Sequence, residues 1–82
     1  MERIKVYGTK WCRDTILARK VLDERKIDYE WIDIKQDLEA EKFVKETNQG
    51  YRSVPTILFP DKSILVEPSR DELIQKLVLM GL

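Results

Sequence analysis

The feature that most constrains the fold is a strand-like segment, a helical segment and a second strand-like segment within the first 34 residues. Residues 3–7 alternate between charged and apolar side chains, which is typical of a short strand. Residues 13–26 contain no Gly or Pro and carry apolar side chains at helical spacing. Residues 29–34 are rich in aromatic and β-branched side chains. A right-handed crossover is the expected connection, so the two strands are predicted to be parallel.

The rest of the chain predicts a helix, a hairpin and a last helix. Residues 38–47 form an amphipathic pattern that ends before Gly50, a residue suited to the left-handed region after a helix. Residues 56–59 are a continuous apolar run, expected of a buried central strand, and residues 64–66 follow closely enough to pair with it. Ser69 to Glu72 has the spacing of a capping box, so the last helix is expected to start there.

These two later helices are each expected to bury one apolar face. For residues 38–47 that face comprises Leu38, Phe43, Val44 and Thr47. For the last helix it comprises Leu73, Ile74, Leu77, Val78 and Met80. The chain of 82 residues is therefore predicted to be one α/β domain, residues 1–82, in the order β-α-β-α-β-β-α. A four-stranded mixed sheet flanked by three helices is expected.

Composition disfavours several classes of partner. The 15 Lys and Arg residues equal the 15 Asp and Glu residues, whereas nucleic-acid binders usually carry a basic excess, so no nucleic-acid partner is expected. No apolar run approaches the roughly 18 residues of a membrane span, and no export signal is evident at the start of the sequence. A single thiol without such a signal favours the cytoplasm.

Two residue counts exclude much catalytic chemistry. The chain has no histidine, which excludes imidazole bases, Cys-His nucleophilic catalysis and His metal sites. It has one cysteine, which excludes an internal disulfide and a zinc site built from several Cys ligands of one chain. No metal site is predicted, and packing alone is expected to stabilise the fold.

The single cysteine, Cys12, lies between the first strand and the first helix. Unpaired N–H groups and the helix dipole favour an anion at that position, so a thiolate is favoured there. Lys10 and Arg13 act in the same direction, and Asp14 opposes them. The alternative interpretation is a small buried apolar residue, a common role for free cysteine. A strand–loop–helix junction is where α/β sheets place their sites, and this favours the functional interpretation.

Two short motifs together resemble the thioredoxin superfamily. The first is Trp11-Cys12-Arg13-Asp14-Thr15 at the start of a helix, and the second is Ser53-Val54-Pro55-Thr56 before the third strand. The short order of elements resembles the glutaredoxins, over essentially the whole chain. Residues 48–56 and Pro68-Ser69 look most like the mycoredoxin and NrdH-like branch of that family.

The resemblance implies roles for the residues nearest the thiol. Cys12 matches the nucleophile, and Trp11 matches the aromatic residue before it. Pro55 matches a cis-proline that packs beside the thiol. The backbone of Val54 would then pair with an extended thiol ligand or peptide, as an added strand does.

The resemblance also implies contacts with a ligand carboxylate. Arg52 matches a basic residue that can meet such a group. Ser69 and Arg70 match a helix start whose backbone N–H groups hold it. Lys10 and Arg52 are the cations most suited to function, with solvated surface charge as the equal alternative for each.

Thr15 stands where the family usually has a second cysteine, which leaves only a monothiol cycle. Its hydroxyl could hydrogen-bond the Cys12 thiolate, or the residue could have no role. The family's Gly-Gly-x-Asp pattern before the last helix is replaced by Glu67-Pro68-Ser69-Arg70. The expected cosubstrate is a low-molecular-weight thiol, glutathione or an analogue, with no tightly bound cofactor.

The resulting prediction is a monomeric monothiol thiol–disulfide oxidoreductase. It would reduce mixed disulfides between proteins and a low-molecular-weight thiol in redox homeostasis. The alternative is a non-catalytic thioredoxin-fold module that binds a peptide or thiol ligand. An iron–sulfur carrier is a third interpretation, disfavoured because the bulky charged pair Arg13-Asp14 would lie beside the metal.

Overall fold

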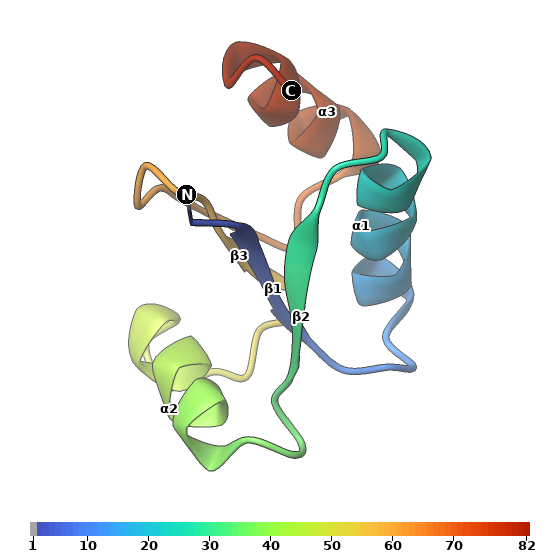
Figure 1. Ribbon diagram of the computed structural model, residues 1–82. Coiled ribbons are helices and arrows are strands. Elements are labelled where there is room, and N and C mark those ends of the chain that lie inside the picture. The colour runs from blue at the N-terminus through green and yellow to red at the C-terminus, as the bar shows by residue number, and fades with distance from the viewer. Residues whose placement is uncertain (1) are drawn as a thin grey trace.

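The computed structural model describes residues 2–82 as one mixed sheet with helices on both faces (Figure 1). The elements are β1 (Ile4–Gly8), α1 (Arg13–Glu24), β2 (Tyr29–Asp33), α2 (Leu38–Thr47), β3 (Thr56–Leu58), β4 (Ile64–Val66) and α3 (Arg70–Leu79). This order confirms the predicted fold class.

The four strands lie in the order β2-β1-β3-β4. β1 and β2 are parallel, with Ile4 opposite Tyr29 and Gly8 opposite Asp33. β3 is antiparallel to both β1 and β4. The parallel crossover and the antiparallel hairpin are therefore as predicted, and β3 is an inner strand with Ile57 fully buried.

Two apolar clusters fill the two faces of the sheet. α1 and α3 cover one face, where the buried cluster comprises Ile4, Val6, Ala18, Val21, Leu22, Ile57, Phe59, Leu73 and Leu77. α2 covers the other face, where the cluster comprises Tyr7, Ile34, Ala40 and Val44 (Figure 1). Val6 and Tyr7 belong to different clusters because successive side chains of a strand point to opposite faces.

Two predicted core positions are wrong. Leu38 is 81 % exposed at the first position of α2, and Val78 is 59 % exposed in α3. Leu73 and Leu77 supply the buried stripe of α3, and Val78 is turned about 100° from Leu77 around the helix axis. Val78 therefore leaves the face that packs on the sheet.

The first helix ends two residues earlier than predicted. Lys26 has a φ of 57°, in the left-handed region, and its N–H donates to the carbonyl of Asp23. After α2, Gly50 has a φ of 97°, and its N–H donates to the carbonyl of Lys45. The predicted left-handed glycine after α2 is thus confirmed.

Across residues 2–82, every helix is too short or too polar to cross a lipid bilayer. The longest, α1, has 12 residues, against about 20 for a typical span.

Candidate functional site

Cys12 is the N-cap residue of α1, directly after the loop that leaves β1. Its carbonyl accepts the first helical hydrogen bond, from the N–H of Ile16 at 2.9 Å. Its own N–H donates to the carbonyl of Thr9 at 3.3 Å, so the loop is a tight turn. The side chain makes no capping hydrogen bond, which leaves the sulfur free to point elsewhere.

The thiol of Cys12 points to the segment before β3. Its Sγ donates a weak hydrogen bond to the carbonyl of Val54 at 3.7 Å, across 42 residues of sequence. The Val54–Pro55 peptide bond is cis, as predicted, and Pro55 is buried while Cys12 is half-buried. The Val54 N–H has no partner among residues 2–82 and is available to an extended ligand.

Asn48, at the end of α2, holds the turn that presents Val54. Its side-chain amide donates to the carbonyl of Val44 at 2.8 Å and to Oγ1 of Thr56 at 3.1 Å. The Thr56 hydroxyl donates in turn to the carbonyl of Ser53 at 2.7 Å. Sequence reasoning missed Asn48, because nothing in its spacing links a helix-ending residue to a turn eight residues later.

Thr15 is fully buried one helical turn after Cys12, against the end of β1. Its hydroxyl has no hydrogen-bond partner within residues 2–82, so it does not bond Cys12 in this structure. A Cβ added at Gly8 would approach Thr15 Cγ2 to 2.6 Å and Oγ1 to 2.7 Å. Gly8 is therefore a second missed residue, since the lack of a side chain there makes room for Thr15 at the end of β1.

The predicted residues closest in sequence to Cys12 form an exposed rim. Trp11 is 85 % exposed, and Lys10 and Arg13 are also exposed. Neither Lys10 nor Arg13 makes an ion pair within the described part of the chain. These three side chains are thus accessible to a partner that reaches the thiol.

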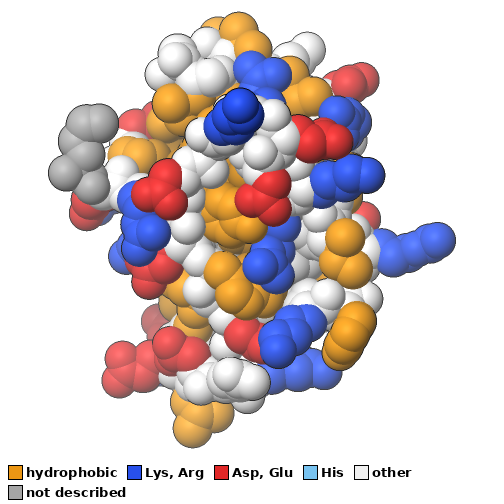
Figure 2. Space-filling view, turned by 45° about the vertical axis from the view of Figure 1, so that its right-hand side comes forward, with side chains coloured by type: hydrophobic (Ala, Val, Ile, Leu, Met, Phe, Trp, Pro, Cys, Tyr) orange, Lys and Arg blue, Asp and Glu red, His pale blue; other side chains and the backbone are white. Residues whose placement is uncertain are grey.

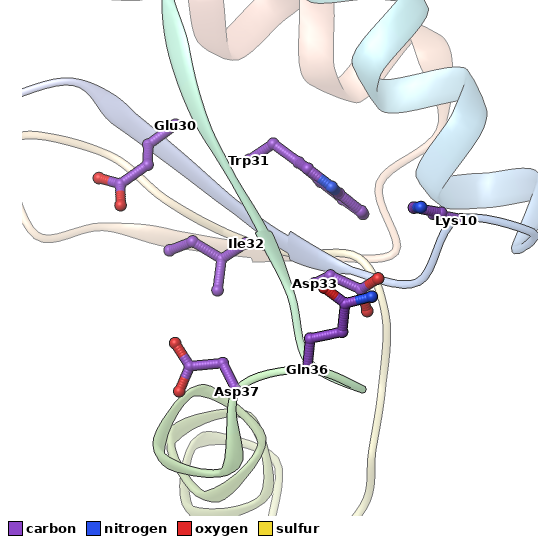
Figure 3. Close-up of a pocket in the computed structure, with 7 residues that line it drawn as sticks. All are labelled: Lys10, Glu30, Trp31, Ile32, Asp33, Gln36 and Asp37. Atoms are coloured by element: carbon purple, nitrogen blue, oxygen red, sulfur yellow. The ribbon is translucent and has the colours of Figure 1, made fainter.

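Lys10 borders a shallow pocket of about 310 Å³ at the end of β2. The residues that line it are Lys10, Glu30, Trp31, Ile32, Asp33, Gln36 and Asp37. Figure 3 shows the Trp31 ring extending from β2 toward Lys10, with Asp33 on the same side of the strand and Glu30 and Asp37 on the other side. The guanidinium of Arg19 lies 4.1 Å from the centre of the Trp31 ring and covers it from α1.

Arg52 is paired within the chain. Its Nε lies 2.8 Å from a carboxylate oxygen of Glu41, on α2. The Arg52 side chain is 43 % exposed and that of Glu41 is 25 % exposed. The residue predicted to meet a ligand carboxylate therefore already contacts a carboxylate of its own chain.

The predicted capping box at the start of α3 is confirmed. The Ser69 hydroxyl accepts from the N–H of Glu72 at 3.1 Å, and the Ser69 N–H donates to the Glu72 carboxylate at 2.9 Å. These hydrogen bonds lower the pKa of Glu72 below its ordinary value. The Ser69 N–H expected to face a ligand carboxylate thus holds Glu72 instead.

Arg70 is not brought to the thiol. Its guanidinium lies 3.2 Å from the carboxylate of Glu24, the last residue of α1. Glu24 is twelve residues from Cys12, about 18 Å along the helix axis. The backbone before Arg70 is nevertheless tied to the site, because the N–H of Glu67 donates to the carbonyl of Pro55 at 2.9 Å.

A sequence-family comparison assigns the chain. The glutaredoxin family model matches residues 4–64, which is more than half of the sequence. The chain belongs to the glutaredoxin family. Its single cysteine fits the monothiol form expected from Thr15 at the second position. Among residues 2–82, no group of three or more His, Cys, Asp or Glu side chains is placed to hold a metal ion.

Curated relatives support the same family. A glutaredoxin-like protein of Mycobacterium tuberculosis is 39 % identical over 75 residues, covering 92 % of this chain and 89 % of the relative. Mycoredoxin 1 of Corynebacterium glutamicum is 36 % identical over 77 residues, covering 94 % and 95 %.

Solved structures confirm the thioredoxin-like fold. The thioredoxin-like protein BC3987 superposes with a TM-score of 0.76 at 25 % identity, covering 89 % of this chain and 97 % of that one. The glutaredoxin-like NrdH-redoxin of Escherichia coli superposes with a TM-score of 0.74 at 22 % identity, covering 89 % and 92 %.

Proposed function

We propose that this glutaredoxin-family protein is a monothiol thiol–disulfide oxidoreductase that acts through Cys12. The observation that carries the proposal is the position of the Cys12 sulfur. It lies at the N-terminus of α1, half-exposed and 3.7 Å from the carbonyl of Val54 beside the cis-proline. The helix start and the exposed side chains of Lys10 and Arg13 lie beside this sulfur, so it is accessible to a partner that carries a disulfide.

The proposed cycle has two exchange steps. The Cys12 thiolate attacks the small-thiol sulfur of a mixed disulfide, and the protein client leaves as a thiolate that takes a proton from solvent. A second low-molecular-weight thiol, as its thiolate, then attacks the small-thiol sulfur bound to Cys12. Cys12 returns to the thiolate, and the two small thiols leave as their disulfide. The second thiol supplies the two electrons, because the chain has no second cysteine.

The backbone of Val54 is the proposed guide for the substrate. Val54 is partly exposed, its N–H is unpaired within residues 2–82, and its carbonyl accepts the weak hydrogen bond from Cys12 Sγ. An extended peptide or small thiol can add to them as a strand adds to a sheet edge. We infer that the protein works as a monomer in the cytoplasm, where a reduced pool of small thiols is maintained.

Cys12→Ser is the first test. The variant should lose all measurable reduction of a peptide mixed disulfide, because serine supplies no sulfur nucleophile. Thr15→Ala should retain activity within about tenfold, because Thr15 can contribute at most one hydrogen bond to the thiolate. Release of the peptide thiol, followed by mass spectrometry, measures both rates.

Multiple turnovers separate this proposal from a non-catalytic module. With excess mixed disulfide and excess small thiol, the wild-type protein should release many equivalents of peptide thiol per chain. A module that only binds would stop at one equivalent held on Cys12. That result, or full activity in Cys12→Ser, would overturn the proposal.

A further inference from the structure

A small hollow between the sheet and the start of α2 has the chemistry of a site for an organic cation. Resting on the function proposed above, we propose that this α2 hollow binds the guanidinium group of an arginine side chain of the protein client, close to the client's disulfide. The hollow has a volume of about 270 Å³ and is lined by Tyr7, Ile32, Asp37, Glu39, Ala40 and Phe43.

The phenol of Tyr7 is an unpaired polar group in this hollow. The Tyr7 side chain is only 8 % exposed, yet its hydroxyl makes no hydrogen bond within residues 2–82. A buried tyrosine hydroxyl ordinarily has a hydrogen-bond partner. Because Tyr7 lines the α2 hollow, its hydroxyl oxygen is available to accept from an N–H group of a ligand that enters there.

Three carboxylates without a cationic partner lie near this phenol. Asp37 and Glu39 line the α2 hollow, and Glu30 lines the adjoining pocket, which shares Ile32 and Asp37 with it. None of the three carboxylates makes an ion pair within the described part of the chain. Figure 3 shows Glu30 and Asp37 on the same side of β2, with Ile32 between them. Burial first, and then the charges of Glu30 and Asp37, raise the pKa of Tyr7, which indicates that a cation is favoured beside it.

The cations closest to these carboxylates leave the α2 hollow free. Lys10 lies on the opposite side of β2 from Glu30 and Asp37 (Figure 3). Lys5 is on the same face of β1 as Tyr7, but it lines neither pocket and makes no ion pair within residues 2–82. The positive end of the α2 dipole is offset by Asp37, whose side chain caps the helix.

Two aromatic rings make the α2 hollow better suited to a guanidinium than to an ammonium group. Tyr7 and Phe43 both line it, and their ring centroids lie 4.7 Å apart with an interplanar angle of 35°. A guanidinium is planar and weakly hydrated, so it can stack on an aromatic face while its edge donates hydrogen bonds to carboxylates. The rings and the carboxylates thus match the two kinds of contact that an arginine head group makes.

The α2 hollow lies within reach of a client held at Cys12. Tyr7 precedes Cys12 by five residues, so their Cα atoms are no more than about 18 Å apart. An extended peptide advances about 3.3 Å per residue. An arginine within about five residues of the client cysteine can therefore enter the hollow while Cys12 attacks the mixed disulfide.

The experiment compares peptides that carry arginine or citrulline near their cysteine. Citrulline has nearly the shape of arginine but no charge, and each peptide is a mixed disulfide with N-acetylcysteamine, an uncharged thiol. The residue is moved along the peptide, one position at a time. With protein in excess, the rate of peptide-thiol release reports the attack of Cys12 alone. We expect arginine to accelerate release at least about fivefold over citrulline at one or more positions, the combined effect of a cation–π contact and exposed charge pairs. An ionic strength of about 1 M should remove most of this preference.

Three conservative variants test the assigned residues. Asp37→Asn keeps a side chain that can cap α2, Glu30→Gln removes one charge, and Tyr7→Phe removes only the hydroxyl. Each should lower the arginine-to-citrulline rate ratio by about twofold or more. Glu46→Gln, an exposed carboxylate of α2 that makes no ion pair within residues 2–82, is the matched control and should keep the wild-type ratio.

The outcomes separate the two proposals. A wild-type ratio near one at every position would overturn this inference and leave the proposed function standing, because the citrulline peptides would still react. A preference for arginine that all three variants retain, or that Glu46→Gln reduces equally, would overturn the assignment to the α2 hollow. Failure of the wild-type protein to attack any of the peptide disulfides would overturn the proposed function and this inference with it.

Discussion

Gly8 and Thr15 are predicted to depend on each other for stability. A methyl group at Gly8 would lie 2.6 Å from Cγ2 of Thr15, well inside contact distance. Because Thr15 is fully buried, it has little room to move away. Gly8→Ala should therefore lower the free energy of unfolding by about 1–3 kcal/mol, the usual cost of overpacking. Urea denaturation at neutral pH measures the change.

Thr15→Ala provides the control for this contact. It removes the two atoms that the added methyl group would approach most closely and leaves only Cζ3 of Trp31, at 3.2 Å, so Gly8→Ala should cost less in the Thr15→Ala background. The two changes should thus be non-additive in a double-mutant cycle. Strict additivity would contradict the proposed contact and indicate that the strand end itself rejects a side chain.

The central residues of the candidate site could be predicted from the sequence, but the residues that position them could not. Cys12, Val54 and Pro55 follow from two motifs that the family places together. Gly8 and Asn48 have no such signal, because their function depends on which side chain arrives from another element. Gly8 matters because Thr15 of α1 packs against the end of β1, and Asn48 matters because Thr56 lies beside the end of α2. Both contacts exist only in the folded chain.

At the scale of elements, the capping box of α3 predicts a dependence on pH. Hydrogen bonds from Ser69 hold the pKa of Glu72 below its ordinary value. The charged carboxylate of Glu72 therefore stabilises the fold fully when the pH is above the ordinary pKa of glutamate. This stabilisation is lost as the pH falls from the ordinary pKa through the lowered pKa of the folded protein. Glu72→Gln cannot titrate, so the difference in melting temperature between wild type and variant should shrink between pH 7 and about pH 3.

The comparison with Glu72→Gln is needed because another carboxylate titrates in the same direction. Hydrogen bonds from the side chain and backbone of Ser63 also lower the pKa of Asp61, so both proteins lose stability in acid. Only the difference between the two melting curves isolates Glu72. A difference that stays constant with pH would show that the capping box does not depend on the charge.

Elements with strong periodicity were predicted within about two residues, and their ends account for most of the discrepancies. α1 ends at Glu24 because Lys26 adopts a left-handed backbone conformation. No glycine stands at that position to indicate the helix end from the sequence. Leu38 and Val78 carry the right residue type for a core but lie on the wrong face of their helices. Periodicity indicates that a helix has an apolar face, and packing decides which positions at its edge are buried.

At the scale of the whole molecule, the charges are balanced and locally paired. Figure 2 shows Lys and Arg side chains interleaved with Asp and Glu on the face it displays. The pair Arg70–Glu24 joins α3 to α1 across 46 residues, and Arg52–Glu41 joins the turn before β3 to α2. The sequence could not predict these pairs, because a long cationic side chain has many carboxylates within reach until the elements pack.

Oxidation of the whole protein tests whether Cys12 can form a disulfide only with another molecule. Cys12 is half-buried beside exposed Trp11 and has no cysteine partner in its own chain. Oxidation of the pure protein with diamide, without a small thiol, should therefore produce a disulfide-linked dimer, which Cys12→Ser should not form. Non-reducing electrophoresis and intact mass measure the product.

Thr15→Cys should suppress that dimer. Positions 12 and 15 are one helical turn apart, a separation that a disulfide can bridge. At micromolar protein, a thiol in the same chain has an effective concentration in the millimolar range, so the internal disulfide should form first. The oxidised variant should remain a single chain, two mass units lighter than its reduced form because two hydrogens are lost. Dimer formation equal to that of the wild type would show that the fully buried Thr15 position cannot reach the sulfur of Cys12. The protein would then be restricted to monothiol chemistry by its packing as well as by its sequence.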